Sequence, residues 1–597
     1  MLGRHLQLPG RDPGAPRAGR GLTRALVWAC VLLAGGSAGC GDGSASDGAT
    51  NSPAPGSAPS SAPAAAADPD APRGWASAGP PQLVLSVVID ALDSETLERL
   101  LPALPERGFI RRAMREGAHY PRAELPYAAT YSEPAYATLY TGATPRLTGV
   151  VASELRDPEL PGPPRVRTVA DSLREATAST AKVVSLALDP QIAWAGVGHR
   201  ARGGWAHHVE RGRYVPLGPA WDNPNERSGV RGAQDRHLDT SRYLAPWLPH
   251  DEAFLGQFAG SDMVEGELDW QRLGVVFPRD PRRAPLPALA LHVTPRSTES
   301  LLALAARRIQ EDRLGQDDIP DLLAVSIGAT GVAARLYGVH SWEYLDNLVA
   351  ADLLLAELVD MLTERGPVTV LLTSDCGVVD LPERHRDHQR VDPEVLRDAL
   401  DDGMDVLLER RIAWVESIIP PYVYLTRGAP FRMDEAVTAA LRFLQGRPEV
   451  LRAYAVDAIP GANDGGDAID ALVRESVVAG LGGEIYLVPR DGYLFDTRPP
   501  RGGGTGAGGI TAREREVPIL LVGAGVIAGE TEARVDIRRY APTLTALLGV
   551  PRPPASRLPP LSAVRASPPS ALPGRVDPAT GQTETEPELE ETAEAAE

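Results

Sequence analysis

Seven short apolar segments, separated by helical patterns, limit the folds open to this chain more than any other feature of its sequence. They read LVLSVVID (83–90), KVVSLAL (182–188), DLLAVSI (321–327), PVTVLLTSD (367–375), PYVYLT (421–426), EIYLV (484–488) and VPILLVG (517–523). Most of them lack the alternation of apolar and polar residues that a half-exposed strand shows. This pattern favours strands that are buried on both faces.

Helical patterns lie between these strands, for example over 94–117, 343–366 and 536–550. Alternating buried strands and helices predict an α/β sandwich with a mostly parallel central sheet flanked by helices. Residues from about 189 to 296 break the alternation and are rich in Trp, His, Gly and Pro. We therefore expect an inserted cap there.

The first 40 residues predict a secretory signal that ends in a lipidation site. Several arginines precede the apolar run ALVWACVLLAGGSAGC, which is shorter than the roughly 20 residues that cross a bilayer. Its end, Ser37-Ala38-Gly39-Cys40, is similar to a bacterial lipobox, although Ser37 stands where Leu is usual. We predict a lipid anchor on Cys40; the alternative is a signal peptide that is cut elsewhere.

Composition divides the rest of the chain into three parts. Residues 41–80 are dominated by Ala, Pro, Ser and Gly, which predicts a disordered tether. Residues 81–565 carry the strand and helix patterns of a folded domain, and residues 566–597 predict a disordered acidic tail. After processing at Cys40 only Cys376 remains, so no disulfide is expected within the domain.

The charge of the chain bears on its partners. The formal net charge is −19, and no basic stripe with interleaved aromatic residues is present. Because nucleic-acid phosphates are held chiefly by Lys and Arg, we expect no nucleic-acid partner.

Two predicted strands end in aspartate, at Asp90 and Asp375. In open α/β sheets ligands bind beyond the carboxyl ends of the strands. Aspartates at these ends serve either as metal ligands or acid/base groups, or as caps of the following helix.

Several motifs, in this order over most of 81–560, resemble the alkaline phosphatase superfamily. They include VVIDAL, PYAATYSEPAYATLYTGATPRLTGV, GHRARGGWAHH, PDLLAVSIGATG, LLTSDCG, GEIYLVPRDGYLF and REREVPILLVGAGV. The resemblance is to its type I phosphodiesterase/nucleotide pyrophosphatase branch and to single-chain bacterial alkaline phosphatases. It implies their α/β fold and the hydrolysis of phosphate esters by a Ser or Thr nucleophile and two zinc ions.

Four positions keep part of the implied site. Asp90 matches the first metal-binding Asp, Ser132 the nucleophile and Asp375 the Asp of an Asp-His-Gly motif, in which Cys376 replaces His. The resemblance therefore leaves a candidate single zinc site made of Asp90, Ser132, Asp375 and Cys376. The alternatives are that Ser132 caps a helix, as Glu133 beside it favours, and that Cys376 packs as a small apolar residue.

Other positions depart from the implied site. The second metal's Asp and His fall on Gly331 and Arg335, and its late His falls on Ala507. Family positions that contact substrate, a Lys-x-Arg pair and an Asn, fall on Asp189, Gln191 and Ser153. The two-zinc site is therefore not expected.

Three further features leave alternatives open. Arg335 is a candidate contact for an anion, or else an exposed or ion-paired arginine. His385 and His388 are candidate substitute metal ligands, or part of a solvated loop. For His207 and His208, in the expected cap, the sequence identifies no partner.

Together these features predict a lipid-anchored, extracytoplasmic protein of the bacterial cell envelope, on the periplasmic face or in the outer membrane. We expect a pseudoenzyme that binds an anionic small molecule or a protein partner that the sequence does not identify. The alternatives are an active hydrolase of phosphate monoesters or diesters that uses Ser132 and one zinc ion, and a purely structural envelope protein.

Overall fold

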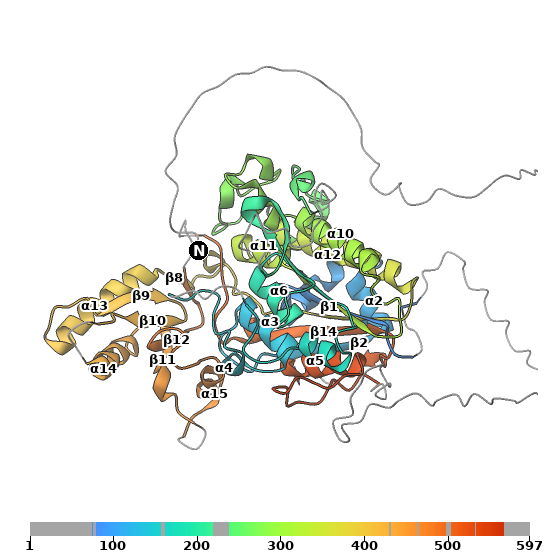
Figure 1. Cartoon of the computed structure of the whole chain (residues 1–597). Coiled ribbons are helices and arrows are strands. Elements are labelled where there is room, and N and C mark those ends of the chain that lie inside the picture. The colour runs from blue at the N-terminus through green and yellow to red at the C-terminus, as the bar shows by residue number, and fades with distance from the viewer. Residues whose placement is uncertain are drawn as a thin grey trace, which may run out of the picture. The chain divides into compact units, whose positions relative to one another are not determined.

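The computed structural model describes residues 74–75, 79–156, 162–218, 238–428, 432–461, 465–496, 503–531 and 533–565 (Figure 1). All of them belong to one compact unit, Pro72–Glu597. The predicted signal segment with Cys40, nearly all of the predicted tether and the predicted acidic tail lie outside the described residues. Among the described residues, no helix combines the length and the apolar character needed to cross a membrane.

Within the described residues, ten strands form a central sheet. They are β1 (Leu83–Ile89), β2 (Ala118–Glu124), β3 (Val183–Ala187), β4 (Gly204–His208), β5 (Arg213–Pro216), β6 (Asp321–Ile327), β7 (Val368–Thr373), β14 (Glu516–Gly523), β15 (Gly529–Glu530) and β16 (Val535–Asp536). Their order is β15-β2-β14-β7-β1-β6-β3-β4-β5, and β16 also pairs with β2. Strand β1 is parallel to both β6 and β7, whereas β14 is antiparallel to β7 and β2. The predicted α/β fold with a mostly parallel central sheet is confirmed.

Helices cover both faces of this sheet. They are α1 (Ser94–Leu100), α2 (Phe109–Glu116), α3 (Ser132–Thr141), α4 (Pro145–Thr148), α5 (Val169–Ala176), α6 (Pro190–Val197), α8 (Glu252–Ala259), α9 (Pro287–Ala290), α10 (Pro295–Glu311), α11 (Ala329–Tyr337), α12 (Trp342–Thr363), α16 (Ala512–Arg515) and α17 (Tyr540–Leu547). On β1, Leu85 and Val87 face one apolar cluster and Val84 and Val88 face the other, which explains the missing alternation.

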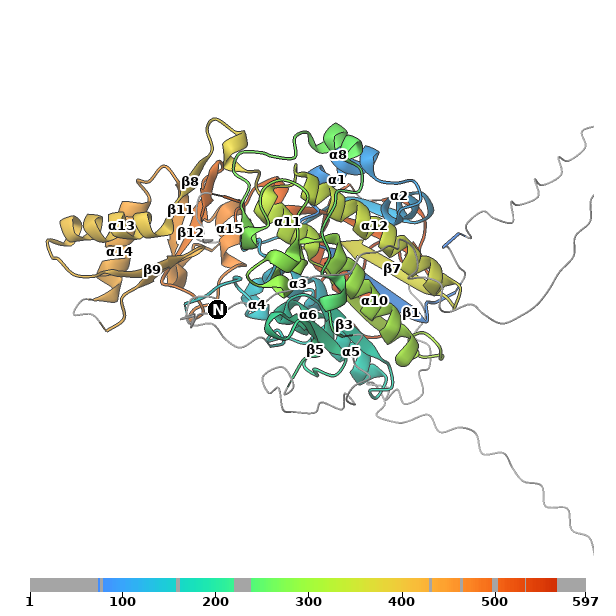
Figure 2. The same ribbon diagram turned by 90° about the horizontal axis from the view of Figure 1, so that it is seen from above.

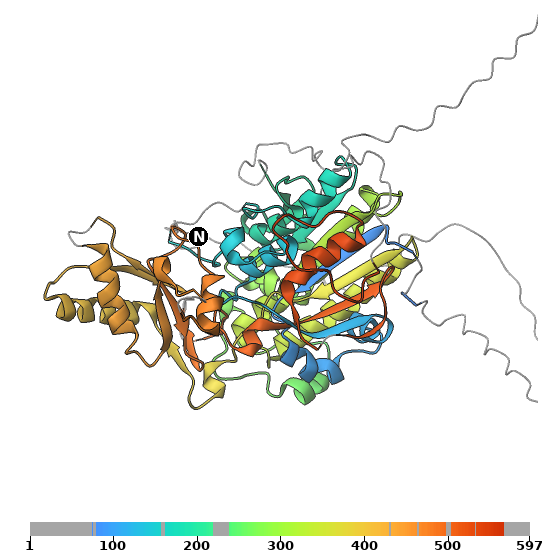
Figure 3. The ribbon, with the colours of Figure 1, turned by 90° about the horizontal axis from the view of Figure 1, so that it is seen from below.

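The first cluster joins the sheet to α1, α2, α10, α11 and α12, and Figure 2 shows α10 and α12 lying along the strands. The second cluster joins the opposite face to α3, α5, α6 and α17. Figure 3 shows the red helix α17 across that face.

The chain between β7 and β14 forms a separate sheet that the sequence did not predict. Its strands are β9 (Val415–Ile419), β10 (Tyr422–Leu425), β11 (Val450–Ala455) and β12 (Ile485–Pro489), in the antiparallel order β11-β12-β10-β9. Around it lie α13 (Pro393–Leu408), α14 (Met433–Leu444), α15 (Ala468–Arg474) and the parallel pair β8 (Gln389–Val391) and β13 (Tyr493–Phe495), gold and orange in Figure 1. Two predicted strands, β10 and β12, thus belong here. They resemble central strands because apolar clusters cover both of their faces too.

The expected cap, about 189–296, differs from the structure at its start. Helix α6 and strands β4 and β5 lie within this range, yet β4 and β5 extend the central sheet beside β3. The described remainder, from residue 238, carries only short helices such as α8 and α9 before α10 begins.

Trp75 lies within the range predicted as the tether, but it packs on the domain. Its side chain is only 2% exposed. The ring stacks on Phe109 at 5.2 Å, and the guanidinium of Arg112 lies 3.8 Å from its centre. The indole N–H donates to Asp360 over 2.8 Å. The ordered contacts of the domain therefore begin before residue 81.

Candidate active site

The two aspartates that end predicted strands meet at one edge of the sheet. Asp90 directly follows β1, and Asp375 lies two residues beyond β7, its parallel neighbour. The backbone N–H of Ala91 donates to Asp375 Oδ1 over 2.8 Å, so a hydrogen bond links the segments that follow β1 and β7. Asp90 is 4% exposed and Asp375 1% exposed. Both carboxylates are therefore nearly out of contact with solvent.

Ser132 points at one of these carboxylates. It is the first residue of α3, whose N-cap is Tyr131. The Ser132 hydroxyl donates to Asp375 Oδ2 over 2.5 Å. Ser132 is therefore not the N-cap that the sequence offered as an alternative, and its hydroxyl is held in the site.

Arg335 completes the group. It lies in the last turn of α11, and its Nη2 donates to Ser132 Oγ over 2.7 Å. The same nitrogen is 3.7 Å from Asp375 Oδ2. A side chain at Gly331 would place its Cβ 2.6 Å from Asp90 Cβ and 3.0 Å from Arg335 Nη1. Because Gly331 has no Cβ, Asp90 and the Arg335 guanidinium can lie against its backbone.

The charges of the site depend on burial and on these neighbours. Burial and the nearby Asp375 hold the pKa of Asp90 well above its usual range, although a hydrogen bond from Tyr136 and the charge of Arg335 oppose the shift. Burial works against the charge of Arg335, but the nearby carboxyl groups, Asp375 above all, raise its pKa. Arg335 is therefore a fixed cation between carboxyl groups.

A family comparison adds to this geometry. The model of the type I phosphodiesterase / nucleotide pyrophosphatase family matches residues 84–501. The chain belongs to this family.

Two curated members of the same superfamily align with most of the chain. Alkaline phosphatase PhoV of Synechococcus elongatus is 23% identical over 525 residues, which are 80% of this chain and 91% of PhoV. Alkaline phosphatase PafA of Elizabethkingia meningoseptica is 22% identical over 79% of this chain and 92% of PafA. The crystal structure of wild-type alkaline phosphatase PafA matches with a TM-score of 0.72 at 19% identity, over 82% of this chain and 99% of that one. This likeness shows the shared fold.

Metal-dependent hydrolysis is the chemistry of this family, but the residues found here do not fit a metal ion. Three of the four carboxylate oxygens accept hydrogen bonds: Asp90 Oδ1 accepts from Tyr136 at 2.6 Å, and both oxygens of Asp375 accept hydrogen bonds. A guanidinium stands beside Ser132. Throughout the described ranges, no group of three or more His, Cys, Asp or Glu side chains is placed to hold a metal ion.

Cys376 belongs to the apolar cluster on the α3 face of the sheet and has no solvent exposure. Burial and the charge of Asp375 raise the pKa of its thiol well above the usual value. Without a metal ion, a protonated and buried thiol matches the alternative that Cys376 packs as a small apolar residue.

The positions that contact substrate in the family's pattern are acidic or neutral here. Asp189 caps α6 by accepting from the backbone of Gln191 at 2.7 Å. The Gln191 side chain bonds to the backbone of Gly162, and Ser153 donates to Glu133. Burial and the charge of Glu133 raise the pKa of Asp189 to about 6. This side of the site therefore offers carboxyl groups where a phosphate ester would need cations.

We expect Asp189→Asn to flatten the dependence of stability on pH between about 4 and 6. The folded pKa of Asp189 lies above its unfolded value, so its protonation stabilises the fold at low pH, and this contribution is lost as pH rises through about 6. Thermal unfolding of both proteins across this range measures the effect. Asp318→Asn, at an exposed surface position, is the matched control; equal slopes in all three proteins would contradict the assignment.

The histidines singled out in the sequence have other partners. His385 contacts Asp380, and His388 stacks on His385 with ring centres 4.2 Å apart. His207 Nδ1 lies 2.7 Å from His292 Nε2, and His207 Nε2 lies 2.9 Å from the Thr240 hydroxyl. His208 is only partly buried.

Sequence reasoning missed two parts of the site. Tyr136 bonds to Asp90 and to Ser326, and its position one helical turn after Ser132 is the signal that could have revealed it. The glycine-rich loop after residue 502 packs on Arg335: the backbone N–H of Thr505 donates to the Arg335 carbonyl over 2.7 Å. Gly504 has φ +75° and leaves no room for a Cβ, which would lie 2.5 Å from that carbonyl.

Proposed function

We propose that this chain is a pseudoenzyme of the family, in which Arg335 takes over the role of the metal cations. The contact of its guanidinium with Ser132 and Asp375 is the observation that supports this most directly. A guanidinium neutralises buried carboxylates, but it cannot activate a hydroxyl as a metal ion does. The fold would then persist without the hydrolytic chemistry.

A binding role follows from this proposal. The Ser132 site and the cap would bind an anionic small molecule or a protein partner in the cell envelope. The resemblance of Ser37–Cys40 to a lipobox supports a lipid anchor on Cys40, and the relatives named as bacterial alkaline phosphatases support an extracytoplasmic location.

A second candidate function is an active phosphate-ester hydrolase that uses Ser132 and a single metal ion. The short hydrogen bond from Ser132 to Asp375 favours it, because a carboxylate in that position can accept the proton of an attacking hydroxyl. The candidate requires Arg335 to leave the site when a metal ion binds to Asp90, Asp375 and Cys376.

The two functions differ in metal content and in hydrolysis. We expect the full chain, expressed with zinc, to hold far less than one zinc ion per molecule by elemental mass spectrometry. We also expect Ser132→Ala and the unchanged chain to hydrolyse phosphate monoesters and diesters at the same background rate.

Cys376→Ala and Ser153→Ala are the controls, the first within the candidate metal set and the second outside it. Stoichiometric zinc that disappears in Cys376→Ala, together with hydrolysis that disappears in Ser132→Ala, would refute the pseudoenzyme and support the single-metal hydrolase.

A further inference from the structure

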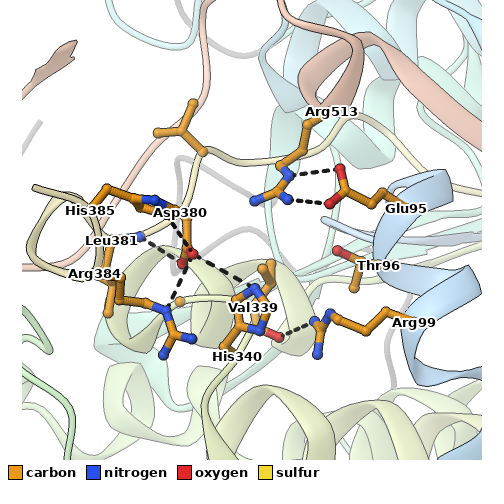
Figure 4. Close-up of polar contacts among 12 residues, drawn as sticks. Glu95, Thr96, Arg99, Val339, His340, Asp380, Leu381, Arg384, His385 and Arg513 are labelled. Atoms are coloured by element: carbon orange, nitrogen blue, oxygen red, sulfur yellow. Dashed lines mark hydrogen bonds and ion pairs between the residues drawn. The ribbon is translucent and has the colours of Figure 1, made fainter. Parts of the chain in front are cut away.

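A second group of charged side chains lies beyond the Ser132 site. The segment 375–380 begins in that site with Asp375 and ends in the second group with Asp380 (Figure 4). Its members, which we call the arginine-histidine cluster, are Arg99 on α1, His340 after α11, Asp380, Arg384 and His385 after β7, and Arg513 on α16.

Asp380 organises half of the cluster. Its carboxylate accepts from the backbone N–H of Leu381 over 2.9 Å. Oδ2 lies 3.1 Å from His385 Nε2, 3.7 Å from His340 Nε2 and 3.3 Å from Arg384 Nε. One nearly buried carboxylate therefore holds two imidazoles and a guanidinium in place.

Two more guanidinium groups face this assembly. Arg99 Nη2 donates to the carbonyl of Val339, next to His340, over 2.7 Å. Arg513 donates to Glu95 over 2.5 Å and 3.3 Å, and the Glu95 side chain is largely exposed. In Figure 4 the guanidinium groups of Arg99, Arg384 and Arg513 surround His340.

The cluster contains more guanidinium groups than carboxylates that pair with them, which favours an added anion. Three guanidinium groups face the carboxylates of Asp380 and Glu95, and the nearby carboxylate of Asp93 accepts two hydrogen bonds from Thr96 as the cap of α1. Burial and the charges of Arg99, Arg384 and Arg513 together lower the pKa of His340 to about 4, against the opposing charge of Asp380. His340 is therefore neutral at physiological pH and gains a proton readily only when negative charge is added nearby.

We propose that Arg99, Arg384, Arg513 and His340 bind a dianionic oxyanion of the phosphate-monoester class. Guanidinium forks match the spacing of phosphate oxygens and favour the dianion over a singly charged carboxylate. Proton uptake by His340 then balances part of the added negative charge. The site is separate from Ser132 and does not depend on the function proposed above.

Calorimetric titration of the full chain with inorganic phosphate tests this site. Affinity for the phosphate dianion, corrected for the protonation of phosphate itself in this range, should rise about tenfold between about pH 8 and about pH 6, because each bound anion favours the protonated imidazole. Repeating the titration in buffers with different heats of ionisation counts the protons taken up. His340→Gln should abolish much of this uptake while it leaves weaker binding in place.

Three arginine variants separate this site from other sites. Arg99→Gln and Arg513→Gln should each weaken phosphate binding about tenfold or more, as expected for the loss of a charge-assisted hydrogen bond. Arg282→Gln, at an exposed arginine paired with Asp280, should leave binding unchanged. Matching thermal unfolding curves verify that the variants are folded.

The anion has two possible sources, a soluble phosphate compound and a phosphomonoester lipid headgroup. Retention on phosphatidic acid vesicles but not on phosphatidylcholine vesicles, reversed by free phosphate and lost in Arg99→Gln, would identify the lipid source. Phosphate binding without such retention would identify a soluble ligand. Absence of phosphate binding at both pH values, or binding that survives in Arg99→Gln and Arg513→Gln but is lost in Arg335→Gln, would overturn the proposal.

Discussion

Arg335→Ala should lower the free energy of unfolding by about 3 kcal/mol at neutral pH, which is the range for removing one partner of a buried ion pair. The Arg335 side chain is 18% exposed and the Asp375 side chain is fully buried. Without Arg335, Asp90 and Asp375 face each other with no cation between them, and Ser132 loses a donor. Chemical denaturation of the full chain measures the loss.

The loss should shrink as pH falls. The charge of Arg335 opposes the raised pKa of Asp90, so its removal raises that pKa further; the variant takes up a proton on folding and recovers stability under acidic conditions. Arg335→Lys keeps a cation and should retain part of the stability. Arg282→Ala, at an exposed pair with Asp280, is the control. If Arg335→Ala unfolds at the same denaturant concentration as that control, Arg335 does not neutralise the site.

Trp75→Ala should lower the free energy of unfolding by about 3–5 kcal/mol, as for other large side chains removed from a core. The substitution removes a buried ring, and with it the stack on Phe109 and the contact with the guanidinium of Arg112. A chain that begins at Pro81 lacks the same contacts. It should therefore unfold at a lower denaturant concentration than a chain that begins at Pro72.

Trp75→Phe separates the contributions at this position. It keeps an aromatic ring on Phe109 but loses the indole N–H that donates to Asp360, so it should cost only about 1 kcal/mol. Equal stability of the chains that begin at Pro72 and Pro81 would show that Trp75 does not stabilise the domain.

The strands were predictable where burial is the same along the whole segment. The segments at 83–90, 321–327 and 367–375 contain β1, β6 and β7, which are adjacent and buried along their whole length. The segments at 421–426 and 484–488 are also short and mostly apolar but form β10 and β12 of the second sheet. An apolar segment indicates that both faces of the strand are covered by other side chains. It does not indicate to which sheet the strand belongs.

The candidate site was predictable in part for a similar reason. Asp90 and Asp375 follow adjacent parallel strands, so their meeting at one edge follows from the strand pattern. Whether Ser132 would cap its helix or bond to Asp375 did not follow, because both uses of a serine occur at a helix start. The metal-ligating role assigned to Cys376 by resemblance stays a prediction that its burial does not favour.

The sequence by itself determined the family, the buried parallel strands, the two aspartates at their ends and the unusual residues at Gly331 and Arg335. Tertiary structure alone decided that Arg335 turns to Ser132, 203 residues away, and that Trp75 packs beside Asp360, 285 residues away. The physical reason is the range of the interactions. Strand burial is encoded in neighbouring residues, whereas the direction of a long side chain depends on charges and surfaces that only the folded chain brings together.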